Sequence, residues 1–172
     1  EIRFLFIGRV MKEKGVDELF EVAKKIKKEY SNVFFDIVGP MEDNYKERID
    51  KLVKNGIIEY HGYQEDVKPF IQKCQCFVLP SYHEGMANTL LEAGAMGRPL
   101  MTSRIHGCME AVEDGKNGYL VKAKDTEELL EQIQKFLSID YEKKKEMGEV
   151  SRKIIEKRFD KKKVVEKTMK LL

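Results

Sequence analysis

The sequence predicts an α/β fold in which helices cover both faces of one parallel sheet. Short apolar runs alternate along the chain with segments whose apolar residues recur at helical spacing. Most of these runs are apolar throughout, which is typical of strands that are buried on both faces of a parallel sheet. Turn and cap residues stand between the runs and the helical segments. Together, these three observations predict a Rossmann-like architecture.

Six apolar runs are the expected strands, and glycine and proline mark where the first two end. The first run ends at Gly8-Arg9 and the second at Gly39-Pro40. Glycine permits turns with a positive φ and proline has no backbone N–H for a sheet ladder, so both stop a strand. The expected strands cover residues 2–7, 33–38, 57–60, 77–79, 99–102 and 118–121.

The segments between the runs have the spacing of amphipathic helices. In the first of them, Val16, Leu19 and Ala23 fall on one helical face. Asp125 and Glu128 have the spacing of a capping box, which marks the start of another helix. The expected helices cover residues 16–30, 45–53, 66–73, 90–95, 125–137, 150–159 and 163–172.

The length of 172 residues indicates one domain, residues 1–172, that is large enough for a proper core. The composition is that of a soluble globular protein without a secretory signal. No apolar run approaches the roughly 20 residues that a membrane helix needs. The chain lacks an initiator Met and opens within an apolar run, so we expect a domain excised from a longer protein. We expect it to lie in the cytoplasm.

The net charge of +2 conceals an uneven distribution. Residues 141–172 carry twelve Lys or Arg and six Asp or Glu, so their net charge is +6 and that of the remaining chain is −4. Charges interspersed on amphipathic helices are usually a solvated face. We therefore expect no nucleic-acid partner. Whether these basic helices contact a missing domain or lie peripherally on a membrane stays open.

Metal and cofactor chemistry have little support in the sequence. Cys74, Cys76 and Cys108 lack the spacing of a zinc site, and we expect buried thiols in a reducing compartment. There is no Asp-x-Asp pair and no His/Cys/acid cluster. We expect His61 and His83 to be ordinary loop or strand-end histidines. The prediction is that no metal and no cofactor is bound.

A strand, a glycine loop and a helix follow one another around residues 80–99. Gly85 lies at the bend of the loop, and the helix starts near Thr89 and Leu90. The first backbone N–H groups of a helix have no partner within the helix and point at an incoming anion. This pattern predicts a site for a phosphorylated sugar or a nucleotide.

Two carboxylates bracket this helix start, and each has an ordinary alternative. Glu84 lies in the loop, where an exposed acid is common, and Glu92 is expected in the first helical turn. Thr89-x-x-Glu92 has the spacing of a capping box, so Glu92 could serve its own helix. Asn88 could cap the helix instead, which would leave Glu92 free for the hydroxyl groups of a ligand.

A second cationic stretch follows the first strand, at residues 8–15. Gly8 allows a close approach of the backbone, and Arg9 and Lys14 can both lean toward one ligand. A guanidinium and an ammonium suit a diphosphate because both stay charged and donate charge-assisted hydrogen bonds. The alternative is a surface turn with two solvated cations. The glycine spacing differs from a dinucleotide-binding fingerprint.

These two stretches resemble motifs of retaining GT-B glycosyltransferases, and family 4 is the most similar group. The seven residues between Glu84 and Glu92 and the closing Gly97-Arg98-Pro99 are similar to the E-x7-E motif. Residues 8–15 are similar to the family signature G-R-x(4)-K-G. The resemblance covers the whole chain as the C-terminal, donor-binding half of the GT-B fold. It implies an N-terminal acceptor domain that this chain does not contain.

The resemblance implies a role for each candidate residue. Arg9 and Lys14 would bind the donor diphosphate, Glu84 would face the transferred sugar, and Glu92 would bind the ribose hydroxyls. The amides at the helix start would meet the leaving phosphate. The backbone of Gly107 would lie near the phosphates, and the role of Glu110 stays undecided. Tyr63 and Gln64 would lie beside the nucleobase. Tyr63 could equally be a buried edge tyrosine.

The resemblance implies retaining, metal-independent transfer of a hexosyl group from a nucleotide-diphosphate sugar, most often a UDP-sugar. The acceptor would be a glycan or a lipid-linked sugar, bound by the missing domain. We expect the isolated domain to bind nucleotide weakly and to transfer little. Two alternatives remain: a GT-B-like sugar-nucleotide epimerase or phosphorylase, and a non-catalytic nucleotide-binding module.

Overall fold

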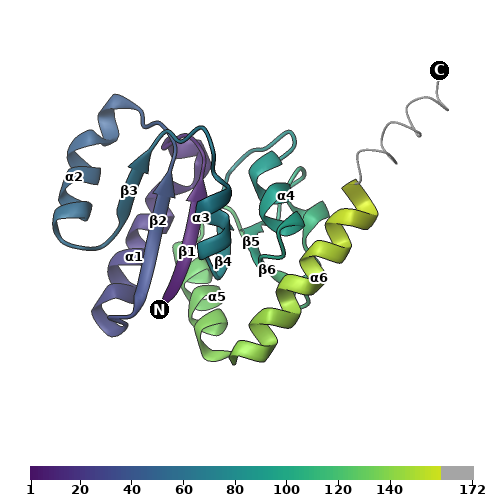
Figure 1. Cartoon of the computed structure of the whole chain (residues 1–172). Coiled ribbons are helices and arrows are strands. Elements are labelled where there is room, and N and C mark those ends of the chain that lie inside the picture. Colours follow the sequence, from purple (N-terminus) through teal and green to yellow (C-terminus); the bar gives the residue numbers. More distant parts are fainter. Residues whose placement is uncertain (160–172) are drawn as a thin grey trace, which may run out of the picture.

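A computed structural model describes residues 1–159 and contains one parallel sheet (Figure 1). Its strand order is β3-β2-β1-β4-β5-β6, and every neighbouring pair runs parallel. The prediction of a Rossmann-like sheet is therefore confirmed. The strands are β1 (Ile2–Ile7), β2 (Val33–Val38), β3 (Glu59–Gly62), β4 (Cys76–Leu79), β5 (Leu100–Ser103) and β6 (Gly118–Val121).

The third strand begins two residues later than the prediction of 57–60. The amide of Ile57 donates to the carbonyl of Leu52 at 2.9 Å and closes the turn that precedes the strand. Ile58 is buried, so its apolar character reflects burial in this turn and not strand pairing.

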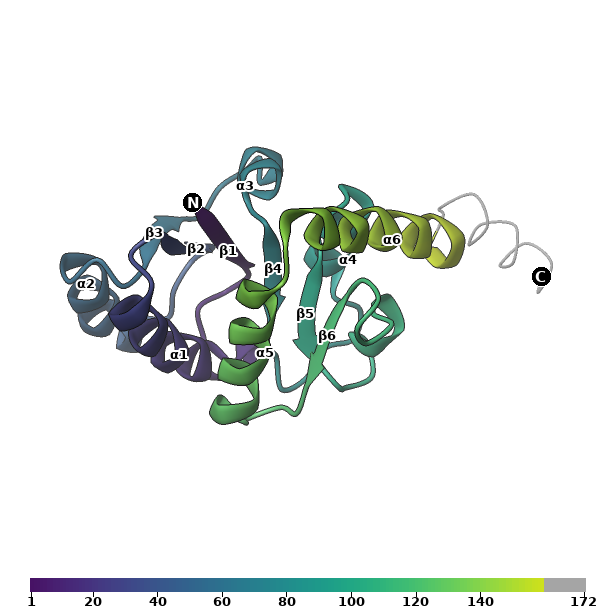
Figure 2. The same ribbon diagram turned by 90° about the horizontal axis from the view of Figure 1, so that it is seen from below.

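Helices cover both faces of the sheet, as Figure 2 shows from below. α1, α2 and α5 lie on one face, and α1 contacts α5. α3, α4 and α6 lie on the other face, where α4 packs against α6. The helices are α1 (Val16–Glu29), α2 (Lys46–Lys54), α3 (Lys68–Lys73), α4 (Asn88–Ala95), α5 (Thr126–Ser138) and α6 (Tyr141–Phe159). None of the helices within residues 1–159 has the length and apolar character to cross a bilayer.

The core is built around β1, which pairs with β2 on one side and β4 on the other. Phe4 is fully buried, stacks on Phe35 at a ring distance of 5.3 Å and meets the edge of Phe136 from α5 at 5.7 Å. Each such aromatic side chain contributes several kcal/mol, since truncation of a buried Phe to Ala costs about 3–5 kcal/mol. This core fixes the end of β1, from which the candidate site begins.

α6 starts nine residues earlier than the predicted helix 150–159. Its early part lies close to the turn before β5, because Gly148 has no side chain to separate it from the carbonyl of Gly97. Ser151 and Asn117 are buried and hydrogen-bond each other, which joins α6 to the segment that precedes β6. The predicted helix 163–172 falls outside the described residues.

The start of α5 partly matches the predicted capping box. The carboxylate of Asp125 accepts a hydrogen bond from the amide of Glu128 at 2.9 Å. The carboxylate of Glu128 accepts from the amide of Lys122 at 3.0 Å. The second half of the box is therefore made with Lys122, the residue directly after β6, and not with the cap itself.

The strand order reverses between β1 and β4. From β1 the chain proceeds outward through β2 to β3, and then returns to β4 and proceeds outward through β5 to β6. In open parallel sheets, ligands bind beyond the carboxyl ends of the strands at such a switch point. The loops after β1 and β4 carry the two predicted motifs, so the fold places both motifs where this rule expects a site.

Candidate functional site

Three loops meet at the carboxyl ends of β1, β4 and β5, and we call residues 8–15, 80–90 and 104–110 the switch-point site. The amide of Tyr82 donates to the carbonyl of Glu13 at 2.8 Å, which ties the loop after β4 to the loop after β1. Gly15 has φ +74°, and a Cβ there would lie 1.9 Å from the carbonyl oxygen of Pro80. Only glycine fits this approach, so the two motifs are held together by backbone packing.

Lys14 and Glu84 form an ion pair in this site. Lys14 Nζ lies 2.6 Å from Glu84 Oε1, and the two side chains are 27% and 10% exposed. The hydroxyl of the fully buried Ser81 donates to the same carboxylate oxygen at 2.8 Å. Glu84 is therefore a held, largely buried carboxylate, and the alternative of an ordinary exposed acid is wrong.

Arg9 is exposed and forms no hydrogen bond or ion pair with any residue of the described chain. It follows Gly8, whose amide donates to the carbonyl of Val38 at 2.9 Å. A Cβ on Gly39 (φ +140°) would lie 2.0 Å from the carbonyl oxygen of Gly8, so the ends of β1 and β2 are in direct backbone contact. The backbone beneath Arg9 is fixed, and its guanidinium remains available to a ligand.

α4 begins without a side-chain cap. Its N-cap residue is Ala87, which has no cap side chain, and Asn88 is the first helical residue. Neither of the two caps that the sequence left open, the Thr89–Glu92 capping box and the Asn88 cap, is formed. The amide of Asn88 donates to the carbonyl of Met86 at 3.0 Å, whereas the amides of Thr89 and Leu90 have no acceptor within the described chain. Unpartnered amides at a helix start are ready-made donors for an anion.

Glu92 lies in the second turn of α4 and not in the first, because the helix begins at Asn88. Its side chain is exposed and makes no hydrogen bond with the described residues. Thr89 is three residues earlier on the same helical face, and its hydroxyl donates to the carbonyl of Ile7 at 3.3 Å. Glu92 is thus free of a capping role and lies on the face that approaches the end of β1.

The loop after β5 closes the site on its other side. Gly107 has φ +92°, and a Cβ there would lie 2.4 Å from the carbonyl oxygen of Glu84. The carbonyl of Gly107 accepts from the amide of Ala87 at 3.3 Å. Its own amide donates to Glu110 Oε2 at 2.9 Å, and the other oxygen of Glu110 lies 2.8 Å from Nδ1 of the exposed His106. Glu110 therefore orients the glycine loop.

A pocket of about 160 Å³ adjoins this loop. It includes Gly85 and Gly107 from the two loops and the exposed side chain of Met86. Nothing crowds the Cα of Gly85, since no atom lies within 4 Å of the place that a Cβ would take. This hollow lies next to the carboxylate-bearing loop and is open to a ligand group.

Tyr63 and Gln64 follow β3, two strands away from β1 in the sheet. Tyr63 is 73% exposed, so the alternative of a buried edge tyrosine is wrong. Gln64 is held by a hydrogen bond from Nε2 to the carbonyl of His61 at 2.9 Å. The amide of Gly39 donates to the carbonyl of Gly62 at 2.8 Å, so this loop reaches the end of β2.

The prediction that no His/acid cluster exists is wrong. Asp36, Glu59 and His61 bring potential ligand atoms within 4.8 Å of one another across β2 and β3. The guanidinium of Arg3 lies among them and bonds both oxygens of Asp36 at 3.1 and 3.0 Å and Glu59 at 3.2 Å. His61 Nε2 lies 2.8 Å from Asp36. Because Arg3 supplies the positive charge, this group is an ion-pair network, and His61 is a satisfied strand-end residue.

The three cysteines are free and buried, as the sequence predicts. Burial raises the pKa of Cys74 to about 12 and that of Cys108 to about 11. Burial also raises the pKa of Cys76 well above its ordinary value. At neutral pH these groups are thiols, which are poor metal ligands and poor nucleophiles.

Sequence reasoning missed Ser81 and Tyr82 as parts of the site. Tyr82 is buried and its hydroxyl donates to Glu18 of α1 at 2.6 Å, which anchors the loop that carries Glu84. Burial and the neighbouring Glu18 raise the pKa of Tyr82, so it remains a donor. Their position directly after the fourth strand and before Glu84 is the feature of the sequence that could have identified them.

Residues 1–154 match the family described as glycosyl transferases, group 1. The chain is 34% identical over 129 residues to an N,N'-diacetylbacillosaminyl-diphospho-undecaprenol α-1,3-N-acetylgalactosaminyltransferase of Campylobacter jejuni. That alignment covers 75% of this chain and 34% of the relative. The capsular polysaccharide biosynthesis glycosyltransferase CapM of Staphylococcus aureus is 29% identical over 157 residues, covering 90% of this chain and 41% of CapM. The chain thus spans about a third to two fifths of these relatives.

Solved structures share the fold. A mutant of TarM from S. aureus, crystallised with fondaparinux, α-GlcNAc-glycerol and UDP, superposes with a TM-score of 0.88 at 26% identity, over 99% of this chain and 35% of that one. The C-terminal domain of the group 1 glycosyltransferase LpcC from Francisella tularensis has a TM-score of 0.81 at 20% identity and matches 92% of this chain and 86% of its own. The fold is that of the C-terminal Rossmann-like domain of GT-B glycosyltransferases, and the chain belongs to the glycosyltransferase group 1 family.

Proposed function

We propose that this domain binds a nucleotide-diphosphate sugar, in particular a UDP-sugar, for retaining transfer of a hexosyl group to a glycan or lipid-linked acceptor. The observation that carries the proposal is the uncapped start of α4 beside the end of β1. There, two amides of α4 lack acceptors, Arg9 is unpaired within the described chain, and Lys14 extends toward Glu84. UDP is present in the TarM crystal structure, whose fold this chain shares.

The electrostatics of the site suit a diphosphate. Charge-assisted hydrogen bonds contribute about 1.5–3 kcal/mol each, and a helix start adds about 0.3–1 kcal/mol. Arg9, Lys14 and the α4 amides together supply this stabilisation where negative charge develops on the leaving group. Because these groups stabilise the leaving group, we propose that the transfer proceeds without a divalent cation.

The two glutamates take different parts in the proposal. Glu84 is held by Ser81 and Lys14 and would accept hydrogen bonds from the transferred sugar or stabilise positive charge at its anomeric carbon. Glu92 is exposed and has no capping role, so its carboxylate is free to accept from the ribose hydroxyls. Exposed Tyr63 would stack on the nucleobase.

The acceptor and the remaining catalytic groups belong to a second domain in this proposal. The Campylobacter relative is named for a diphospho-undecaprenol acceptor, and CapM for capsular polysaccharide biosynthesis. We propose a glycan or lipid-linked acceptor of the same class, with the enzyme in the cytoplasm at the membrane surface. The domain alone would bind donor nucleotide but transfer little.

Calorimetric titration with UDP and GDP tests the donor site directly. We expect the wild-type chain to bind nucleotide weakly. Arg9→Ala and Lys14→Ala should each lower the affinity by about tenfold or more, since each removes a charge-assisted hydrogen bond of about 1.5–3 kcal/mol. The control is Lys153→Ala, an exposed lysine of α6 that lies outside the site. Absence of binding at millimolar nucleotide, or equal binding by all four proteins, would contradict the proposal.

A further inference from the structure

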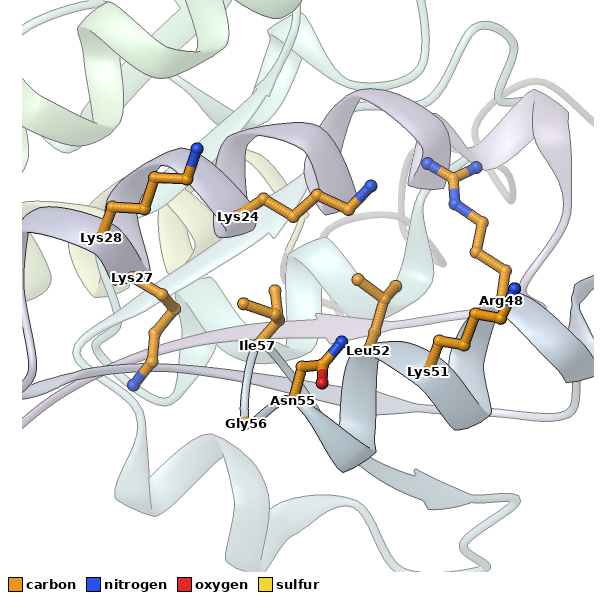
Figure 3. A pocket seen from close by; sticks show the side chains of 9 residues that line it. All are labelled: Lys24, Lys27, Lys28, Arg48, Lys51, Leu52, Asn55, Gly56 and Ile57. Carbon is orange, nitrogen blue, oxygen red and sulfur yellow. The ribbon is translucent and has the colours of Figure 1, made fainter.

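A pocket of about 490 Å³ lies between α1 and α2, away from the switch-point site (Figure 3). Five of its nine lining residues are cationic, and no carboxylate is among them. The pocket lies beside the ends of α1 and α2, just before β2 and β3 begin, whereas the switch-point site lies beyond the ends of the strands. Its lining residues are Lys24, Lys27, Lys28, Arg48, Lys51, Leu52, Asn55, Gly56 and Ile57.

The two helices contribute the cations from opposite sides. Figure 3 shows three lysines on α1, with Lys51 and Arg48 on α2 and Leu52 and Ile57 between the helices. Lys28 has no hydrogen-bond or ion-pair partner in residues 1–159. Lys27 donates to the carbonyl of Val33 at 2.9 Å and its ammonium lies 4.4 Å from the centre of the Phe34 ring, so its contacts are with uncharged groups. The pocket therefore concentrates positive charge over an apolar floor.

Lys24 and Lys51 have carboxylate partners that lie on the helix surfaces, and Arg48 pairs with Asp17 and Glu21 of α1. Lys24 pairs with Glu21 at 3.0 Å, and both side chains are nearly half exposed. Lys51 pairs with Glu47 at 3.2 Å, and both are largely exposed. Exposed pairs of this kind contribute little and exchange readily with other anions. An entering anion could therefore recruit Lys24 and Lys51 without breaking a buried interaction.

Helix-end stabilisation accounts for only part of this arrangement. Lysines in the last turn of a helix complement its dipole, and Lys27, Lys28 and Lys51 fit that description. Arg48 does not, because it is the third residue of α2, where the dipole disfavours a cation. Lys24 lies in the interior of α1. Arg48 pairs with Asp17 and Glu21 of α1 and lies 5.3 Å from the centre of the Phe20 ring, so it links the two helices. Lys28, which has no such partner among the described residues, is the cation most available to a ligand.

A second, smaller pocket of about 330 Å³ continues from the first and shares Lys27, Gly56 and Ile57 with it. Its other lining residues include Phe34, Tyr60 and the exposed Val53. Glu59 also lines it and pairs with Arg3 at 3.2 Å, so the combined surface is cationic at one end and, apart from this paired carboxylate, largely apolar at the other. That combination suits a phosphate group joined to a less polar body.

We propose that the pocket between α1 and α2 is an anion site that takes a multiply charged phosphate group, separate from the donor site. The phosphate could come from a lipid headgroup or from a free phosphorylated ligand, and the chemistry of recognition is the same for both. The six residues of β2 span roughly 20 Å, so Lys27 and Lys28 at the end of α1 lie about a strand's length from the switch-point site, whereas Arg48 pairs with Asp17 at the start of α1. The proposal is independent of the donor-site proposal.

Amide chemical shifts of the whole chain, titrated with inorganic pyrophosphate, test this site. We expect one set of shifts at Lys28, Gly56 and Ile57 and a separate set at residues 8–15, with different midpoints. Lys24→Gln combined with Lys28→Gln should weaken the first set at least tenfold and leave UDP binding unchanged. The matched control, Lys145→Gln combined with Lys153→Gln, removes the same charge from exposed positions of α6 and should change the first set less than twofold.

A sedimentation arm distinguishes the two phosphate sources. Vesicles of phosphatidylglycerol are compared with vesicles of phosphatidylcholine, with the same two double variants. Phosphatidylglycerol binding that the Lys24/Lys28 variant loses and the control keeps assigns a lipid headgroup. Pyrophosphate shifts at Gly56 without vesicle binding assign a free ligand. The proposal would be overturned if pyrophosphate shifted only the amides of residues 8–15 and both double variants bound phosphatidylglycerol vesicles equally.

Discussion

Replacing Glu84 by Gln removes one negative charge from the switch-point site and keeps the shape of the side chain. The amide oxygen of Gln can still accept from the Ser81 hydroxyl, so the loop should keep its position. Lys14 loses its anionic partner, which lies 2.6 Å away. If Lys14 binds the donor diphosphate, the substitution removes a competitor for that lysine, and UDP should bind more tightly.

The size of the effect follows from the exposure of the pair. Two unit charges 4 Å apart interact by about 4 kcal/mol at an effective dielectric constant near 20, which is an upper bound. Lys14 is 27% exposed and Glu84 is 10% exposed, so water and salt screen part of the attraction. We expect a net gain of about 0.5–1.5 kcal/mol, which corresponds to UDP binding about two- to tenfold tighter.

Calorimetry on a double-mutant cycle measures this gain. Wild type, Glu84→Gln, Lys14→Ala and the double variant are titrated with UDP, with Glu146→Gln as a control that removes an exposed carboxylate of α6. The tighter binding should vanish in the Lys14→Ala background, because the freed ammonium is its cause. Weaker or unchanged UDP binding by Glu84→Gln, or the same gain with Glu146→Gln, would refute this reasoning.

Three further predictions concern the supports of the fold and the site. The buried thiols of Cys74, Cys76 and Cys108 should resist Ellman's reagent in the native chain at pH 8 and react on unfolding, and rapid labelling of the native chain would contradict this protection. Burial raises the pKa of Cys108 from 9.0 to about 11. The free energy of unfolding should therefore fall as the pH rises through that interval. Asn117→Ala should lower the free energy of unfolding by about 2–4 kcal/mol, because its buried amide satisfies several partners; urea unfolding measures it, and a loss below 1 kcal/mol would count against the network. Gly107→Ala should weaken UDP binding and lower stability, since its φ of +92° and the nearby Glu84 carbonyl exclude a Cβ; unchanged titration and melting curves would show that the loop adapts.

Most of the sheet was predictable because the strands other than β3 are largely buried on both faces and therefore read as continuous apolar runs. The exception is instructive. Ile57 and Ile58 look like a strand, but a hydrogen bond from Ile57 to Leu52 makes them part of the preceding turn. Apolar character reports burial, and only hydrogen bonding decides whether a buried residue belongs to a strand. The predicted helix at 150–159 started too late. The first turns of α6 are highly charged and the helix packs there through Gly148, so few apolar side chains mark this part of the helix in the sequence.

The site was predictable as two motifs and not as contacts. The switch-point rule brings the loops after β1 and β4 to one place, as found. The ion pair of Lys14 with Glu84 joins residues 70 positions apart, and local spacing carries no information about it. The same holds for Arg3, Asp36 and His61, whose meeting depends on the register of neighbouring strands.

The start of α4 shows a different limit of sequence reasoning. Thr89, Glu92 and Asn88 offer two ways to cap a helix, and the structure uses neither. The Thr89 hydroxyl bonds the carbonyl of Ile7 at the end of β1 instead. A tertiary contact thus overrides the local cap, and the cost is two unsatisfied amides. In the proposed function, a bound phosphate would satisfy both amides.

A crystal structure of the chain with UDP tests the central claim most directly. We predict that oxygens of the diphosphate accept hydrogen bonds from the amides of Thr89 and Leu90, and that Arg9 and Lys14 reach the same group. UDP bound elsewhere on the chain, or a diphosphate that touches neither amide while both cations point away, would contradict the account.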